Sequence, residues 1–236
     1  MLQHATHAPL AMNRLEIIAH LERAGLPVFD MVIDFQQRLG GLEYSVCGLE
    51  NHSICFNLLQ QVGNSFEVEG FAAANDEEGF SMSNDDRFFF VCAVSRSIPF
   101  TFYLDQAGSM YVHDGTTNRP LPVATSPDKY IESDAVLDEL LSLRPVWHRA
   151  GLGFVASDDA RVNERLALMP LSIISEASDA YTTWWIGDTV RIWRRMHWNI
   201  QHPCSVIIAS AQTQDELEYW RRTLQDLVGE AELMTH

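Results

Sequence analysis

Lysine is almost absent from this sequence. Of the 16 basic side chains only Lys129 is a lysine, and 32 carboxylates outnumber them. A formal net charge of -16 argues against binding to phosphate backbones and to anionic membranes, because those surfaces are themselves negative. We therefore expect no nucleic-acid partner and no membrane partner. A basic protein would be attracted to such a chain, although acidity can also serve only to keep a protein in solution.

Long apolar runs are also absent. No stretch approaches the ~18 apolar residues that span a bilayer, and the first residues lack the apolar core of a signal peptide. The four cysteines, Cys47, Cys55, Cys92 and Cys204, are scattered and form no C-x-x-C pair, so neither a zinc ribbon nor a thioredoxin-like site is predicted. We expect reduced thiols in a cytoplasmic protein.

The signatures of common catalytic and cofactor sites are missing as well. The sequence contains no G-x-S-x-G elbow and no phosphate-binding loop ending in GK[ST]. Its one G-x-G, from Gly151 to Gly153, lacks the third glycine of a dinucleotide site and is typical of a tight turn. We therefore expect no enzyme and no cofactor. The alternative left open is an enzyme whose site is assembled from residues that are distant in the sequence.

One group of residues has side chains that could bind a metal. His197, His202 and Cys204 are close in the sequence, and His148 is a possible fourth ligand. Zinc sites have three or four ligands at recognised spacings, and this spacing matches none of them. We interpret these residues as structural and predict no metal site, although the sequence leaves the question of ligation open.

Two acidic segments are the candidate contacts for a partner. They fall in turn-like sequence and contain Asp76, Glu77, Glu78, Asp85 and Asp86. Neither segment has the alternating ligands of a calcium-binding loop. One interpretation is a pair of solvated turns. The other is a contact surface for an Arg- and Lys-rich partner, because turns carry binding residues more often than cores do.

The hydrophobic periodicity predicts an α+β protein. One helix is expected to begin after Asn13, which is a suitable N-cap, and a second to run from Phe29 or Asp30 to Leu39. Two further helices are expected, one from about Tyr130 and one over 214–228. Strands are expected in the middle, with a β-hairpin over 100–113. We predict a mostly antiparallel central sheet with helices packed at the N-terminus, on one face and at the C-terminus. No linker is evident, so residues 1–236 are expected to form a single domain.

Tryptophan and arginine gather in one late segment. Because the net charge opposes nucleic-acid binding, we expect the tryptophans in the core and the arginines paired with carboxylates, while a protein-binding surface is the alternative. These residues are Trp184, Trp185, Arg191, Trp193, Arg194, Arg195 and Trp198.

Residues 25–42, GLPVFDMVIDFQQRLGGL, resemble the opening of SMI1/KNR4-type proteins of the SUKH superfamily. That opening has a helix, a proline-containing turn, a second helix with an aromatic residue, and a Gly-Gly leading into the sheet. Pro27, Gly40 and Gly41 match it. Residues 102–112, FYLDQAGSMYV, are similar to the strand-turn-strand of the family. The helix expected from about Tyr130 is similar to the helix that closes the family's domain. The resemblance covers residues 13–145, which leaves 146–236 as an extension packed on this core.

The resemblance implies an α+β module that binds a protein and does not catalyse a reaction. Bacterial members of the superfamily are widely immunity proteins that neutralise toxin domains, often nucleases. The implied partner is a basic toxin domain, which agrees with the net charge of -16. A regulatory or scaffold protein of the same fold is the alternative. In either case the three matched residues carry a structural role, not a functional one.

Overall fold

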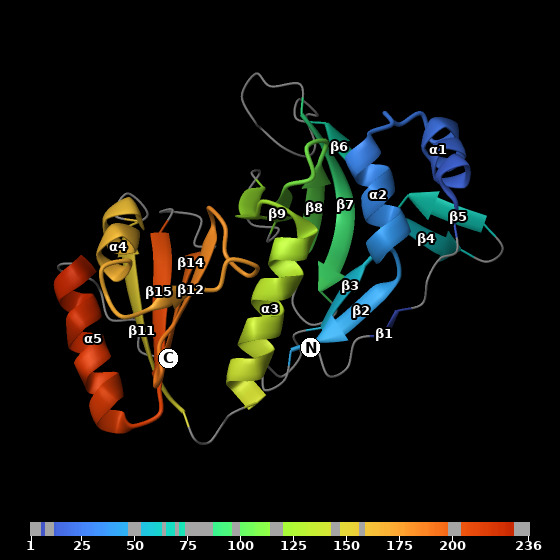
Figure 1. The fold of residues 1–236 in the computed structure, drawn as a ribbon. Helices are drawn as coiled ribbons and strands as arrows, with labels where there is room; N and C mark the ends of the chain where they lie inside the picture. Colours follow the sequence, from blue (N-terminus) through green and yellow to red (C-terminus); the bar gives the residue numbers. More distant parts are fainter. Residues whose placement is uncertain are drawn as a thin grey trace. The chain divides into compact units, whose positions relative to one another are not determined.

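The computed structural model describes residues 6–7, 12–46, 53–62, 65–68, 71–73, 87–95, 100–113, 120–142, 147–155, 159–197 and 204–228. Within these ranges lie five helices and fifteen strands (Figure 1). The chain divides into two compact units, residues 1–128 and 129–236. The division falls in the first turn of α3 (Pro127–Ser142), so most of this helix belongs to the second unit.

Two helices open the first unit. Asn13 caps α1 (Arg14–Arg23) through a capping box with Glu16, which confirms the predicted N-cap. The helix ends in a Schellman motif, in which the Leu26 N–H donates to the Leu21 carbonyl and Gly25 has a φ of 72°. After the turn at residues 26–29, α2 (Asp30–Leu39) begins. Its buried face contacts the sheet through Phe35, whose ring centroid lies 6.1 Å from that of Phe56.

An antiparallel sheet of eight strands forms the body of the first unit. Its hydrogen-bonded order is β1-β2-β3-β7-β8-β9-β10, with β6 also paired to β7. The strands are β1 (Thr6–His7), β2 (Leu42–Ser45), β3 (Ser53–Phe56), β6 (Phe71–Ala73), β7 (Phe88–Ser95), β8 (Thr101–Asp105), β9 (Met110–His113) and β10 (Leu121–Ala124). A separate antiparallel pair contains β4 (Leu59–Val62) and β5 (Ser65–Val68). The pairing of β8 with β9 confirms the predicted hairpin.

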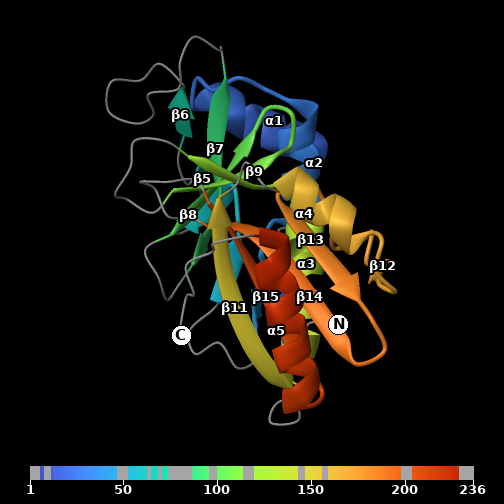
Figure 2. The same cartoon turned by 90° about the vertical axis from the view of Figure 1, so that its left-hand side faces the viewer.

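The second unit contains an antiparallel sheet of five strands in the order β11-β15-β14-β13-β12. Figure 2 shows α5 lying along this sheet beside β11 and β15. The strands are β11 (His148–Val155), β12 (Ser172–Ile173), β13 (Thr182–Ile186), β14 (Val190–His197) and β15 (Cys204–Ala211), and the remaining helices are α4 (Asp159–Leu166) and α5 (Gln214–Val228).

Adjacent tryptophans in β13 occupy opposite faces of the second sheet, as successive strand residues do. Trp185 belongs to the apolar core that α4 and α5 form with the sheet. Trp184 stacks on Trp193 at a centroid distance of 5.0 Å, and its indole N–H donates to Ser133 of α3. All three indoles are buried, which confirms the predicted core role of these tryptophans.

The α+β class and the antiparallel pairing are confirmed. The strands belong to separate sheets, whereas the sequence suggested one central sheet. The observed division falls at residue 128, and the core predicted over residues 13–145 stays a prediction. A single domain over 1–236 stays a prediction.

Candidate functional site

The candidate site is the end of the first sheet where β6 and β7 are joined. The predicted contacts Asp76, Glu77, Glu78, Asp85 and Asp86 lie outside the described residues, but the described residues place both ends of their segment. The chain leaves β6 at Ala73 and enters β7 at Phe88, and the strand register pairs these two residues. The two acidic groups therefore lie, in the sequence, between two residues that are paired at one end of the sheet.

The base of this connection is held by hydrogen bonds at the start of β7. Arg87 donates from Nη1 to the hydroxyl oxygen of Tyr111 over 3.2 Å, and that hydroxyl donates to Oδ2 of Asp105 over 3.1 Å. The Phe88 N–H donates to Oε1 of Gln106 over 2.9 Å. Arg87, the one basic side chain in 74–87, is thus engaged with the sheet, next to the carboxylates that precede it.

Asp105 also organises the neighbouring β8–β9 turn. Its Oδ1 accepts from the N–H groups of Ala107 and Ser109, each over 2.9 Å, while its own N–H donates to the Ser109 carbonyl. The side chain is 5% exposed. A buried carboxylate with this many donors serves the turn, so we assign Asp105 a structural role beside the candidate site.

Gly40 and Gly41 form the passage from α2 to β2. Gly41 has a φ of 87°, a conformation that costs an L side chain strain, and its N–H donates to the Phe56 carbonyl. At Gly40 an added Cβ would lie 2.3 Å from Nε2 of Gln36 and 2.5 Å from its backbone oxygen. Pro27 lies in the turn between α1 and α2. Gly40 and Gly41 thus act through the backbone and close packing. The turn with Pro27 leads instead to Phe29, whose ring centroid lies 5.6 Å from that of Phe88 at the start of β7.

The possible metal ligands of the second sheet lie at opposite ends of its strands. The register pairs His197 directly with Cys204, but it pairs His148 with Ala211 at the other end of β15. At ~3.4 Å per residue, seven residues of strand separate His148 from Cys204 by about 24 Å. His148 therefore cannot share an ion with that pair, and His202 lies outside the described residues. Within the described ranges no three His, Cys, Asp or Glu side chains gather to hold a metal ion.

A buried thiol lies at an irregularity of the first sheet. Between Val91 and Ala93 the β7–β8 register shifts by one residue, and the extra residue, Cys92, is fully buried. Burial raises the pKa of the Cys92 thiol, so the thiol stays protonated at neutral pH. Burial is also the main reason that the pKa of Tyr103 is raised, and Cys92 is the second. A protonated, buried thiol is chemically inert.

A deeply buried charge of the second unit is Arg194, on the sheet face beneath α4. It donates to Asp159 of α4 over 2.5 Å and to the hydroxyl of Thr183 over 2.9 Å. Burial lowers the pKa of the Arg194 guanidinium, and the Asp159 carboxylate counteracts this. The predicted pairing of an arginine of this segment with a carboxylate is confirmed for Arg194. The pair fixes α4 to the sheet and is closed to solvent on the arginine side, which favours a structural role.

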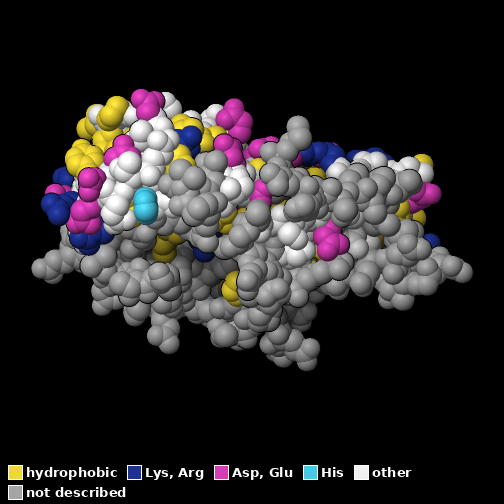
Figure 3. All heavy atoms as spheres, turned by 90° about the horizontal axis from the view of Figure 1, so that it is seen from below, with side chains coloured by type: hydrophobic (Ala, Val, Ile, Leu, Met, Phe, Trp, Pro, Cys, Tyr) yellow, Lys and Arg dark blue, Asp and Glu magenta, His cyan; other side chains and the backbone are white. Residues whose placement is uncertain are grey.

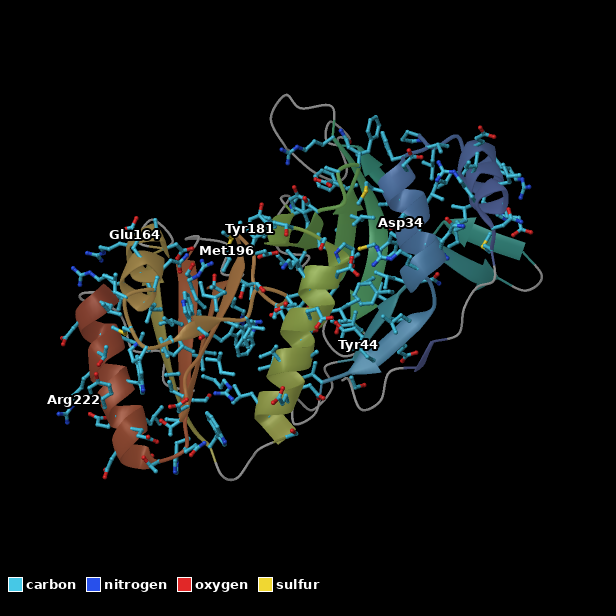
Figure 4. The ribbon with its side chains drawn as sticks, in the orientation of Figure 1. Asp34, Tyr44, Glu164, Tyr181, Met196 and Arg222 are labelled. Atoms are coloured by element: carbon cyan, nitrogen blue, oxygen red, sulfur yellow. The ribbon has the colours of Figure 1, made fainter. Side chains whose placement is uncertain are left out.

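The outer side of α5 carries a hollow of about 390 Å³. Arg222 points outward there in Figure 4, and Figure 3 shows arginine and carboxylate side chains mixed at the end where α5 lies. Tyr219 is 64% exposed in this hollow. Two arginines of α5, Arg221 and Arg222, both bind Glu218 and lower the pKa of its carboxyl to about 2. The sequence predicts a helix over 214–228, and this surface becomes apparent only in the structure.

Comparisons with protein-family models, with curated proteins and with solved structures find no match to this chain. Along the described part of the chain no helix has the length and apolar content to cross a bilayer.

Proposed function

We propose that the chain is a non-catalytic protein-binding module of the SUKH type. In this proposal it acts in the cytoplasm as an immunity protein, and it binds and neutralises a basic toxin domain, for which a nuclease is the leading class.

The observation that carries the proposal is the register of β6 with β7. Ala73 pairs with Phe88 at one end of the sheet, and the five carboxylates of both acidic segments lie between these two residues in the sequence. In this proposal the five negative charges act together as one recognition element. Basic surfaces evolved to hold a phosphate backbone would be attracted to it.

The charge of the whole chain supports the same interpretation. Residues 1–128 contain 16 Asp and Glu side chains against six arginines, so the first unit carries most of the net charge. An acidic protein of this kind would associate rapidly with a basic partner, and salt would slow the association.

The arrangement of the N-terminal elements is a second support. Two helices, a turn with Pro27, and a Gly40–Gly41 passage lead into an antiparallel sheet that contains the β8–β9 hairpin. This is the order of elements that the SUKH resemblance implies for residues 13–145.

A capture experiment followed by a toxicity assay tests the proposal. The full chain is used to capture proteins from a lysate of its source organism at about 0.05 M and about 0.5 M NaCl, since surface electrostatics differ most between these conditions. Each captured basic protein is then expressed with and without the chain. We expect one captured protein that is toxic alone and harmless with the chain. Capture without toxicity, or toxicity that the chain does not relieve, would contradict the proposal.

Two matched variants separate the acidic connection from overall charge. The first neutralises its five carboxylates by Asn and Gln substitutions. The second neutralises five exposed carboxylates elsewhere, at Glu22, Glu132, Glu139, Glu164 and Asp188. Both lose the same charge, so only the first should lose most of the affinity; equal losses would mean that net charge alone attracts the partner.

A further inference from the structure

The connection between α4 and β12 is an uncharged surface on a strongly acidic chain. Residues 166–175, LALMPLSIIS, contain no charged side chain, although Asp, Glu, Lys and Arg make up 20% of the sequence. Leu168 is 88% exposed and Ile173 is 51% exposed. Large aliphatic side chains exposed close together mark interaction surfaces more often than single exposed ones do.

The backbone at this surface is open on one side. β12 is the last strand of the second sheet, and among the described residues no strand pairs with its outer edge. The Ile174 N–H donates to the Trp184 carbonyl, so the alternation of an antiparallel ladder directs the N–H and C=O of Ile173 outward. The next outward carbonyl, that of Ser175, accepts from Lys129, which closes the edge at that point.

The inner side of the same connection is anchored. Met169 and Leu171 pack against the apolar core of the second unit, and a side chain at Gly187 would meet Leu171 at 3.0 Å. Leu168 and Ile173 are therefore the large exposed aliphatic side chains of a segment in which Leu166 is buried and Met169, Leu171 and Ile174 are partly buried. They are five positions apart in the sequence, so their Cα atoms lie no more than about 17 Å apart.

The charges at the two ends of the segment are opposite. Arg165 precedes it and Glu176 follows it, and both are exposed. A two-fold axis that brings Leu168 of one copy against Ile173 of another also brings Arg165 of the first copy toward Glu176 of the second, because the segment runs in opposite directions in the two copies. In a two-fold interface each such contact occurs twice.

We propose that this surface, residues 165–176, is a contact between two copies of the chain. Two copies that each carry a charge of -16 repel one another, so they can approach closely only where no like charges face each other. The segment meets that requirement, and its ends are complementary in charge. A basic partner would instead gain nothing from an uncharged surface, so this contact is separate from the toxin-binding site proposed above and does not depend on it.

Sedimentation of the full chain over about 5–500 μM tests the proposal, a range suited to a small contact surface. We expect a reversible dimer that tightens as NaCl is raised, because salt screens the repulsion between the copies. Toxin binding has the opposite salt dependence, so the two proposals fail independently. A monomer over the whole range at high salt would overturn this one.

Substitutions locate the contact. Leu168→Asp and Ile173→Asp should each raise the dimer Kd by about ten-fold or more, because each would place a charge in an apolar contact. Leu15→Asp is the matched control, since Leu15 is 76% exposed but lies on α1, and it should leave the Kd unchanged. Equal effects of Leu15→Asp and Leu168→Asp would overturn the assignment of the contact to this segment.

A charge exchange tests the two-fold arrangement without altering the apolar residues. Arg165→Glu and Glu176→Arg should each weaken the dimer, and the double variant should restore it. Circular dichroism confirms that each variant is folded. Failure of the double variant to recover would overturn the predicted pairing of Arg165 with Glu176.

Discussion

Arg194 of β14 and Asp159 of α4 form an ion pair in which the arginine is buried and the aspartate is partly exposed to solvent. The Nη1 and Oδ2 atoms are 2.5 Å apart, and the arginine side chain is 1% exposed whereas the aspartate is 21% exposed. The carboxylate lies in the first turn of α4, where the helix dipole favours a negative charge. The pair thus attaches an eight-residue helix, too short to be stable alone, to the sheet.

We expect Asp159→Ala to destabilise the second unit by about 3–5 kcal/mol, because it leaves a buried guanidinium without its counter-charge. The double variant Asp159→Leu with Arg194→Met should lose much less, since no charge remains buried. Urea unfolding followed by tryptophan fluorescence measures both. Glu164→Ala, on the outer side of α4 in Figure 4, is the control and should cost well under 1 kcal/mol. A loss that small for Asp159→Ala would contradict the structural role of the pair.

The Glu218 carboxyl makes α5 sensitive to acid. Hydrogen bonds from Arg221 and Arg222 lower its pKa from 4.5 to about 2 in the folded chain. Because the pKa of this carboxyl is lower in the folded chain than in the unfolded chain, ionised Glu218 stabilises the fold at pH values above about 4.5. This stabilisation is lost as the pH falls from about 4.5 towards 2 and the carboxylate is protonated. Glu218→Gln should therefore be less stable than wild type at pH 7 and should approach it near pH 2.

Thermal unfolding of wild type and Glu218→Gln at a series of pH values measures this difference. Because the side chains are at the surface, high salt should shrink it at every pH. A difference that persists unchanged at pH 2, or that grows there, would mean that the arginines do not stabilise the ionised carboxylate.

The glycines around α2 should respond differently to alanine. Gly25→Ala introduces strain at a φ of 72° but meets no atom within 4 Å, so we expect a cost of about 1–2 kcal/mol. Gly40→Ala instead creates a steric clash, because the added Cβ would lie 2.5 Å from the backbone oxygen of Gln36. Chemical denaturation should rank Gly40→Ala as the more damaging, and the reverse order would contradict the close packing at Gly40.

Gln36 is a buried polar side chain with a defined purpose. It is 1% exposed, and its Oε1 accepts from the N–H groups of Leu58 and Leu59 over 2.9 and 3.2 Å. Gln36→Met leaves two buried N–H groups without an acceptor, at about 1–3 kcal/mol each. Gln37→Met, its exposed neighbour on α2, is the matched control and should be nearly neutral. Equal stabilities of the two variants, measured by urea unfolding, would show that Gln36 does not hold the β3–β4 connection.

Local patterns predicted the first unit well. A capping residue at Asn13, the glycines after Leu39 and the turn over 105–108 each specify backbone geometry within a few residues, and the structure contains α1, the end of α2 and the hairpin where the patterns place them. The tight turn expected from Gly151 to Gly153 is wrong. Both glycines lie in β11, where they pair with Ile208 and Val206 of β15, and this pairing is not visible in the local sequence.

The division of strands between sheets could not be predicted, because strand partners are selected by contacts between distant residues. The same holds for the candidate site. Each acidic segment was visible in the sequence, but the pairing of Ala73 with Phe88, the described residues on either side of the two segments, follows only from the structure. Of the adjacent Arg194 and Arg195, only the strand register shows which one lies beneath α4.

The tryptophans and arginines of β13 and β14 also protect the second sheet against misalignment. A slip of one residue in β14 would move Arg194 out of reach of Asp159, bring Arg195 beneath α4, and remove Trp193 from the stack with Trp184. Both layers would be damaged by the same error, so neither could compensate for the other. The aromatic and basic residues of β13 and β14 thus specify one strand register. Other registers of the same two strands are higher in energy and are disfavoured during folding.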